Sequence, residues 1–179
     1  MADLRTRYMG IELKNPIIAG ASNMVTDIHK LQKLEQAGVA AIVYKSLFEE
    51  QVQLENLELY ELKTEYEHRH AEQVTLFPNS HTVPESPEDY LLHLKKAREA
   101  VSVPFFASLN AINDEVWVEY AVKAAATGVD GLELNFYSLP DESGKDRETI
   151  EKKQVETLRK VKEVVKIPVA VKLTPYYTN

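Results

Sequence analysis

Five short apolar segments recur along the chain and predict β-strands. The clearest is GLELNF at 131–136, in which Leu132 and Leu134 alternate with other residues as in a half-buried strand. The other four are PIIAGA, VAAIVYK, PFFASL and PVAVKL, which predict strands near 16–21, 39–45, 104–109 and 168–173. Each has the length of an ordinary strand, so a single sheet is expected.

The segments between these strands carry apolar residues at the spacing of an α-helix. Each of the first three begins after a residue that commonly caps helices, and two end at a glycine. The expected caps are Thr26 or Asp27, Ser86 and Asn113, and the expected stops are Gly38 and Gly128. A fourth helix is expected over 147–166. The order of elements is βαβαβαβαβ, which predicts a parallel sheet with right-handed crossovers.

An internal repeat favours one architecture among parallel sheets. The segments QAGVAAIVYK and ATGVDGLELN match each other, and so do SVPFFASLN and KIPVAVKLT. Odd and even units therefore match in pairs, as expected from duplication of a two-unit module. The sequence lacks the GxGxxG fingerprint of a dinucleotide-binding sheet and the Walker A pattern. We therefore expect a (β/α)₈ barrel, with a doubly wound sheet as the alternative.

Composition and charge narrow the class of protein. The 179 residues include 21 Lys and Arg against 28 Asp and Glu, a net charge of −7 that argues against nucleic acid and anionic membranes as partners. Cysteine is absent, which excludes disulfides and thiolate nucleophiles, and no apolar run is long enough for a membrane helix. We expect a cytoplasmic protein, in a homo-oligomer, that acts on a small-molecule substrate.

Polar groups stand at the carboxyl ends of all five predicted strands. The pairs are Ser22 with Asn23, Lys45 with Ser46, Ser108 with Asn110, Asn135 with Ser138, and Lys172 with Thr174. Single polar residues often begin turns, but lysine is almost never fully buried without a partner. In a (β/α)₈ barrel the strand ends converge on one mouth, where these enzymes keep their chemistry. The two lysines therefore predict a site for an anionic or electron-rich ligand.

These strand-end motifs resemble those of the dihydroorotate dehydrogenase family of FMN-dependent barrels, especially its soluble branch. The motifs are NPIIAGAS, KS after the second strand, ELNFYS closing the fourth and VKLTP closing the fifth, collinear over nearly the whole chain. The resemblance implies FMN as cofactor, hydride transfer from a dihydroorotate-like substrate and a place in pyrimidine biosynthesis. It also implies that a lysine beside the ring stabilises its reduced, anionic form.

The resemblance also implies roles for individual residues. Those expected to bind the flavin are Ala21, Ser22, Lys45, Ser46, Asn110, Asn135 and Lys172. Ser138 stands where the soluble branch carries a cysteine base, and it is the candidate base here, with Lys45 also at the reacting centre. A hydroxyl is a poor base unless a neighbour or a water chain takes its proton.

The chain departs from the family pattern at two places that concern the substrate. Leu139 stands before Pro140, where the family has Pro-Asn, so one asparagine that would hold the substrate is lost. The substrate loop after the second strand is replaced by a long amphipathic segment and a turn-rich FPNSHTVPESP. In that segment His68 and His70 do not share a helical face, which argues against a metal pair. We therefore expect flavin binding but weak turnover of dihydroorotate.

Residues 1–179 are expected to form the N-terminal part of a single TIM-barrel domain, without its C-terminal strands. Five strands cannot close an eight-stranded barrel, and the FMN phosphate loops of the family follow the seventh and eighth strands. Truncation of a longer protein is the favoured explanation, and completion by a partner or a second copy is the alternative.

Two other functions remain open from the sequence. Lys172 could be the nucleophile of a Schiff-base aldolase-type barrel, which borohydride trapping with an aldehyde would detect. The chain could also be a non-catalytic fragment whose acidic helix mediates association. That alternative predicts no bound chromophore and a fold that depends on a partner.

Overall fold

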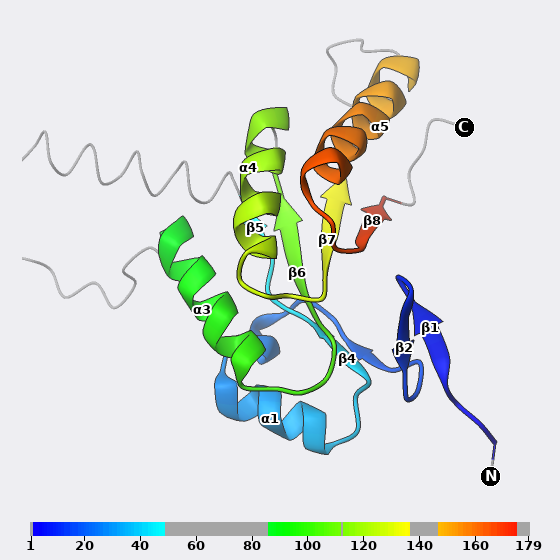
Figure 1. The fold of residues 1–179 in the computed structure, drawn as a ribbon, viewed down its shortest axis with the longest axis vertical. Coiled ribbons are helices and arrows are strands. Elements are labelled where there is room, and N and C mark those ends of the chain that lie inside the picture. The colour runs from blue at the N-terminus through cyan, green and yellow to red at the C-terminus, as the bar shows by residue number, and fades with distance from the viewer. Residues whose placement is uncertain (1, 49–85, 112, 137–146, 175–179) are drawn as a thin grey trace, which may run out of the picture.

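The computed structural model describes residues 2–48, 86–111, 113–136 and 147–174 (Figure 1). Ser138, the amphipathic segment and the histidines at 68 and 70 lie outside these residues. The elements in chain order are β1 (Thr6–Tyr8), β2 (Ile11–Leu13), β3 (Ile18–Ala19), the 3₁₀ helix η1 (Asn23–Val25), α1 (Ile28–Gln36), β4 (Ala41–Val43), β5 (Leu47–Phe48), α3 (Pro87–Glu99), β6 (Phe105–Asn110), α4 (Asp114–Ala125), β7 (Gly131–Phe136), α5 (Arg147–Val164) and β8 (Val169–Leu173).

The five predicted strands form one parallel sheet in the order β3-β4-β6-β7-β8. This confirms the predicted direction of every neighbouring pair, although β3 and β4 are shorter than the predicted 16–21 and 39–45. The short strand β5 adds a parallel pairing to the end of β6. The antiparallel hairpin of β1 and β2 was not expected from the sequence. Figure 1 shows this hairpin across the sheet from α1, α3 and α4.

The internal repeat is visible in the backbone. Gly38 and Gly128 follow α1 and α4 with φ angles of 100° and 87°, the left-handed conformation that ends many helices and favours glycine. Four residues later, the amides of Ile42 and Leu132 both donate to a proline carbonyl at the start of the neighbouring strand, at 3.0 and 2.9 Å. The acceptors are Pro104 and Pro168, which also match in the repeat. The pairing of β4 with β6 therefore has the same register as the pairing of β7 with β8.

Three of the predicted helix starts are confirmed. Asp27 accepts a hydrogen bond from the Lys30 amide at 2.9 Å, and Ser86 accepts one from the Asp89 amide at 3.1 Å. Asn113 stands at the N-cap position of α4 with extended backbone, but the cap bond from its side chain is absent there. The cap bonds of Asp27 and Ser86 satisfy amides that the first turn leaves unpaired. They fix where each crossover helix leaves the edge of the sheet.

The two faces of the sheet pack against different partners. Leu132 and Leu134 of β7 are fully buried on the helix side, together with Phe105 and Leu109 of β6. On the other face, which becomes the interior of a barrel, Phe106 packs with Ala41 and Val43 of β4 and with Leu13 of the hairpin. The alternation along each strand therefore separates a helix-covered core from an inner face.

The hairpin closes the inner face at the amino-terminal ends of the strands. Its two-residue turn holds Met9 at a φ of 53° and Gly10 at 81°, as a type I′ turn requires. The side chain of Met9 reaches Gly131, where a Cβ atom would lie 2.8 Å from Met9 Cε. Tyr8 packs edge-on against Phe106 with ring centroids 5.8 Å apart. Apolar side chains thus form a floor beneath the inner face.

Candidate functional site

The predicted site residues that the structure describes lie along one edge of the sheet because all five strands are parallel. Ala21 and Ser22 follow β3, Lys45 and Ser46 follow β4, and β6, β7 and β8 carry Asn110, Asn135 and Lys172 at or near their carboxyl ends. The structure links three of these residues, Ser46, Asn135 and Lys172, through one hydrogen-bonded network.

Asn135 is the centre of this network. Its side chain is 2% exposed, and its Nδ2 donates to Ser108 Oγ at 3.0 Å and to the Leu109 carbonyl at 3.1 Å. A third, longer contact joins Nδ2 to Ser46 Oγ at 3.4 Å. The carbonyl of Leu109 can only accept, which assigns the nitrogen to this side of the amide. The other amide atom, Oδ1, is buried and has no hydrogen-bond partner among the described residues.

Two serine hydroxyls connect β6 to the segment after β4. Ser46 Oγ and Ser108 Oγ lie 2.7 Å apart, and Ser108 is fully buried. The phenol of Tyr90 in α3 donates to the Lys45 carbonyl at 2.8 Å and, at 3.4 Å, to the Ser108 carbonyl. Tyr90 is itself 2% exposed, so it ties the backbone at both serines to the helix layer. The position of the Ser46 hydroxyl is therefore fixed from two sides.

An ion pair completes the network on β7 and β8. Lys172 Nζ donates to Glu133 Oε1 at 2.8 Å, with the carboxylate side chain 14% exposed and the lysine side chain 44% exposed. Ser108 Oγ donates to the same oxygen at 3.3 Å. Because a buried carboxylate without a counter-charge is costly, Lys172 is the group that makes Glu133 tolerable inside the sheet.

The charges of this ion pair affect the pKa of Tyr8, which lies in the floor of the inner face. Burial is the main cause that raises the pKa of Tyr8 above its usual range, and the negative charge of Glu133 raises it further. The positive charge of Lys172 acts in the opposite direction. Tyr8 therefore stays a neutral phenol beneath the ion pair.

The remaining described residues of the predicted site lie at the same edge with other contacts. Ser22 is exposed, and its hydroxyl caps η1 by accepting from the Met24 amide at 3.3 Å. Ala21 packs against the inner apolar cluster. Lys45 and Asn110 are half-buried, and Asn110 is paired in register with Phe48 of β5. Their expected roles toward a flavin remain predictions.

Sequence reasoning missed Glu133 as part of the site and did not assign a role to Ser108 or Tyr90. The signal for Glu133 was present, since a carboxylate between Leu132 and Leu134 falls on the opposite face of a buried strand and needs a partner there. Its partner depends on the sheet register, in which Glu133 pairs with Ala170, two positions before Lys172. That register was not available from the sequence.

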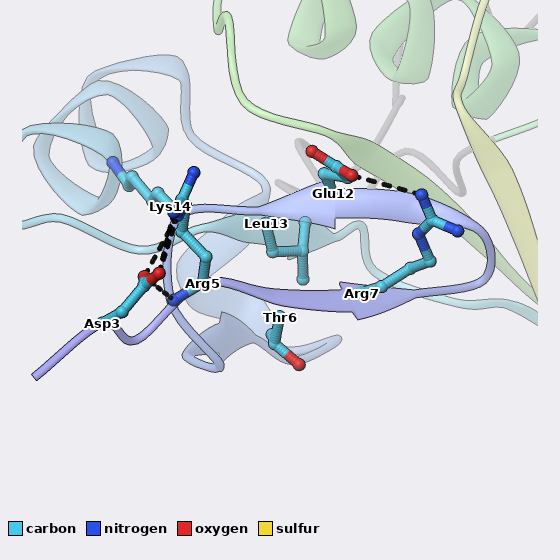
Figure 2. Close-up of a pocket in the computed structure, with 7 residues that line it drawn as sticks. All are labelled: Asp3, Arg5, Thr6, Arg7, Glu12, Leu13 and Lys14. Atoms are coloured by element: carbon cyan, nitrogen blue, oxygen red, sulfur yellow. Dashed lines mark hydrogen bonds and ion pairs between the residues drawn. The ribbon is translucent and has the colours of Figure 1, made fainter.

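A separate pocket of about 490 Å³ lies on the hairpin (Figure 2). It is lined by hairpin and N-terminal residues only: Asp3, Arg5, Thr6, Arg7, Glu12, Leu13 and Lys14. Both of its arginines are engaged in exposed ion pairs, Arg5 with Asp3 at 2.8 Å and Arg7 with Glu12 at 3.2 Å. This pocket is remote from the strand ends and has no part in the network.

Two further properties of the described residues concern metals and membranes. No group of three or more His, Asp or Glu side chains there is placed to hold a metal ion. The helices of the same residues include none with the length and apolar character of a bilayer span.

Comparison with known proteins gives one relative in sequence. No protein-family model matches the chain. The catalytic subunit of dihydroorotate dehydrogenase B (NAD(+)) from Thermoplasma volcanium is 26% identical over 185 residues, covering 100% of this chain and 56% of that protein. The chain therefore spans about half the length of the curated relative that it matches.

Comparison of structures gives the fold. Two solved structures of dihydrodipicolinate synthase, one from Agrobacterium tumefaciens, each cover 90% of this chain, with TM-scores of 0.52 and 0.53. The chain covers 47% and 46% of theirs, at 16% and 14% identity. Likeness at that identity shows fold alone. Together with the sheet order, it confirms the α/β prediction: the chain is a parallel half-barrel of the TIM type.

Proposed function

We propose that this chain carries part of the active site of an FMN-dependent oxidoreductase of the dihydroorotate dehydrogenase type. The similarity in sequence to dihydroorotate dehydrogenase B over the whole chain supports this proposal. The matching strand-end motifs support it further, because Ser46, Asn135 and Lys172 belong to them and meet in one network. The whole protein's activity is part of the proposal, since the chain spans half of that relative.

The observation that carries the proposal is the oxygen of Asn135, which has no partner among the described residues and lies on the register neighbour of Lys172. A flavin ring edge presents both N–H donors and carbonyl acceptors, and the site offers a buried acceptor, Asn135 Oδ1, and a donor cation, Lys172. Leaving a buried oxygen without a donor costs about 1–3 kcal/mol, which a ligand N–H would recover. This pair of one acceptor and one donor therefore fits the edge of a flavin ring.

The chain's own residues supply binding, orientation and charge. When bound, the flavin supplies the chemistry of accepting electrons from a C–H bond of the substrate. Lys172 would supply positive charge to offset the negative charge of a reduced ring, and Asn135 would orient the ring through Oδ1, the oxygen that has no partner among the described residues. The apolar layer of Phe106 and Val43 excludes water from below, which strengthens both interactions. Lys45 and Ser46 are proposed to contact flavin and substrate, and Ser138 to take part in proton removal.

The absorption spectrum of the purified full-length protein tests the proposal most directly. We expect bound FMN, visible as flavin absorption that persists through gel filtration and is released on denaturation. A colourless, folded protein that takes up no added FMN would contradict it. The same experiment separates the proposed enzyme from an association fragment, which would carry no chromophore.

The substrate is tested separately from the cofactor. We expect slow or no reduction of the flavin by dihydroorotate, because a site that has lost a substrate hydrogen bond discriminates strongly against that substrate. Dithionite should still reduce the flavin, which is the matched control. If dihydroorotate does reduce it with a kcat of about 1–10 s⁻¹, Ser138→Ala should slow that step and leave FMN bound.

A Schiff-base enzyme is the second candidate function. The observation that favours it is Lys172 itself, a partly exposed amine at the end of a barrel strand. Its contact with the Glu133 carboxylate opposes it, because a Schiff-base nucleophile must react as the neutral amine. Reduction with borohydride in the presence of an aldehyde substrate should leave Lys172 unmodified under the flavin proposal. A covalent adduct on Lys172 would favour the aldolase-type function.

A further inference from the structure

Glu133 has a different character from the other groups of the network. It is the network's only carboxylate in the described residues, and it faces inward from the middle of β7 rather than from its end. The same oxygen, Oε1, accepts from Lys172 Nζ and from Ser108 Oγ. A carboxylate is an acceptor only, so every polar contact that it makes must come from a donor.

This acceptor sets the direction of the hydroxyls behind it. If Ser108 Oγ donates to Glu133, its remaining lone pairs accept from Asn135 Nδ2 and from Ser46 Oγ. The Ser46 proton then points toward Ser108, and Ser46 Oγ presents lone pairs on its other side. The hydrogen bonds run in one direction, from Ser46 through Ser108 to Glu133.

Among the described residues, the direct neighbours of Glu133 in the sheet are uncharged. Ala170 is the register partner of Glu133 on β8, and Ser108 is its partner on β6. From the hairpin, the phenol of Tyr8 feels both charges of the pair and stays neutral because burial raises its pKa. Phe106 and Val43 pack on the inner face at the level of the floor. Within this part of the structure, Lys172 is the cation that contacts Glu133.

We propose that Glu133 is a positioning residue that holds the Lys172 amine protonated and aimed along the inner face, so that Lys172 acts as a fixed cation and not as a nucleophile. The effect of Glu133 on FMN binding rests on the function proposed above, whereas the pairing of Glu133 with Lys172 does not. Through Ser108 the same carboxylate also orients the Ser46 hydroxyl at the mouth of the half-barrel.

The reactivity of the Lys172 amine tests the pairing without any cofactor. Flavin-free protein is acylated at a mildly alkaline pH with limiting reagent, and the rate at each lysine is followed by mass spectrometry. Only the neutral amine reacts, so Glu133→Gln should raise the rate at Lys172 about tenfold, the effect of losing an ordinary charge-assisted hydrogen bond. Glu133→Asp should stay near the wild-type rate, because it keeps the charge.

Matched controls come from surface pairs elsewhere in the chain. Lys160, paired with Asp114 at 3.0 Å, should react at the same rate in all variants and serves as the internal reference. Glu119→Gln removes the exposed partner of Lys123 on α4 and should leave Lys172 unchanged. Equal rates at Lys172 in wild type and in a folded Glu133→Gln variant would overturn the proposal.

A double-mutant cycle gives a second measure that needs no amine chemistry. Lys172→Met leaves the Glu133 carboxylate without its cation and should lower the melting temperature, and adding Glu133→Gln should restore most of the loss. Independent effects of the two changes would contradict the pairing. This cycle remains informative if either single variant proves too unstable for acylation.

FMN binding by the Glu133 variants then distinguishes the positioning role of Glu133 from the flavin-binding function proposed above. In the full-length protein, Glu133→Gln should weaken FMN binding about tenfold and Glu133→Asp should restore it to within about threefold, as a lost and regained charge-assisted contact would. Wild-type protein that binds no FMN contradicts the proposed function, while the acylation rates still decide the role of Glu133. FMN bound equally by wild type and both variants overturns the positioning role.

Discussion

The two ends of the parallel sheet use polar groups in different ways. At the amino-terminal end, Asp130 accepts a hydrogen bond from the Phe105 amide at 2.8 Å and forms an ion pair with Arg98 of α3 at 3.3 Å. At the carboxyl-terminal end, Asn135 keeps a buried oxygen without a partner among the described residues, close to the ion pair of Lys172.

A second carboxylate at the amino-terminal end, like Asp130, accepts hydrogen bonds from backbone amides of the protein. Glu35, in the last turn of α1, accepts from the Ser102 hydroxyl and amide and from the Val103 amide. It thereby ties the end of a crossover helix to the loop before β6. The two carboxylates at this end are satisfied by the protein, whereas the amide oxygen of Asn135 at the other end has no partner among the described residues. In barrel enzymes these are the ends associated with stability and with chemistry.

The largest expected effect is on FMN binding and comes from a change at the carboxyl-terminal end of the sheet. Lys172→Ala should weaken FMN retention about 10- to 100-fold, the range for a hydrogen bond to a charged group. The free FMN concentration at half-saturation measures it. Lys160→Ala removes a lysine of similar pairing on α5 and should leave FMN binding unchanged. Equal retention in both variants would remove Lys172 from the flavin site.

The floor of the inner face gives the next largest effect, on stability. Gly131→Ala places a Cβ 2.8 Å from Met9 Cε and 3.1 Å from the Pro168 carbonyl, and overpacking of this kind should cost about 2 kcal/mol. Urea unfolding measures the loss. In a Met9→Ala background the same change should cost less, since the shortest of three close contacts is gone and only those to Pro168 and to Phe106 Cδ1, at 3.1 Å, remain. Strict additivity would show that Met9 does not occupy this position.

A smaller effect is expected at the amino-terminal ion pair. Asp130→Asn keeps an oxygen for the Phe105 amide but loses the charge opposite Arg98, which should cost about 1 kcal/mol because both side chains are partly exposed. FMN binding should not change. A loss of flavin in this variant, at full stability, would show that the two ends of the sheet are not independent.

The smallest effect is a dependence of stability on pH. The hydrogen bond from the Ser102 side chain, followed by that from its amide, lowers the pKa of Glu35 below its ordinary range. The stabilisation is therefore present above the pKa of the unfolded state, about 4.3, and is lost as the pH falls through the folded value. Compared with Glu35→Gln, wild type should be more stable near neutral pH, and the difference should shrink in acid. Urea unfolding of both proteins at each pH measures it; a constant difference would contradict the assignment.

The sequence predicted those parts of the fold that depend on local pattern. The apolar alternation in 131–136 and 104–109, the caps at Asp27 and Ser86, and the glycines at 38 and 128 all act within a few residues of themselves. Their repetition also predicted the parallel order. The parallel order in turn predicted that the polar strand ends lie at one edge, because a parallel sheet places all carboxyl ends together.

The parts that were missed depend on contacts between distant segments. The hairpin has strands of only three residues, and its Met9-Gly10 turn lacks the Asn-Gly or Asp-Gly signal. Met9 is held at positive φ while its side chain packs on Gly131, which no local pattern encodes. The pairing of Glu133 with Lys172 likewise requires the register between β7 and β8. Charge inside a strand shows that a partner exists but not which residue supplies it.

The register of the sheet also implies an order of folding. Phe106 of β6 pairs with Gly131 of β7 across one short helical crossover, whereas Ile42 of β4 pairs with Phe105 across a much longer stretch of chain. Closing a longer loop loses more chain entropy before any contact compensates for it. We therefore expect the unit of β6, α4 and β7 to form first and β4 to join it later. Pulse-labelled hydrogen exchange should protect the amide of Asp130, which donates to the Phe105 carbonyl, before those of Ile42 and Tyr44, which donate to the Pro104 and Phe106 carbonyls. Simultaneous protection would contradict this order.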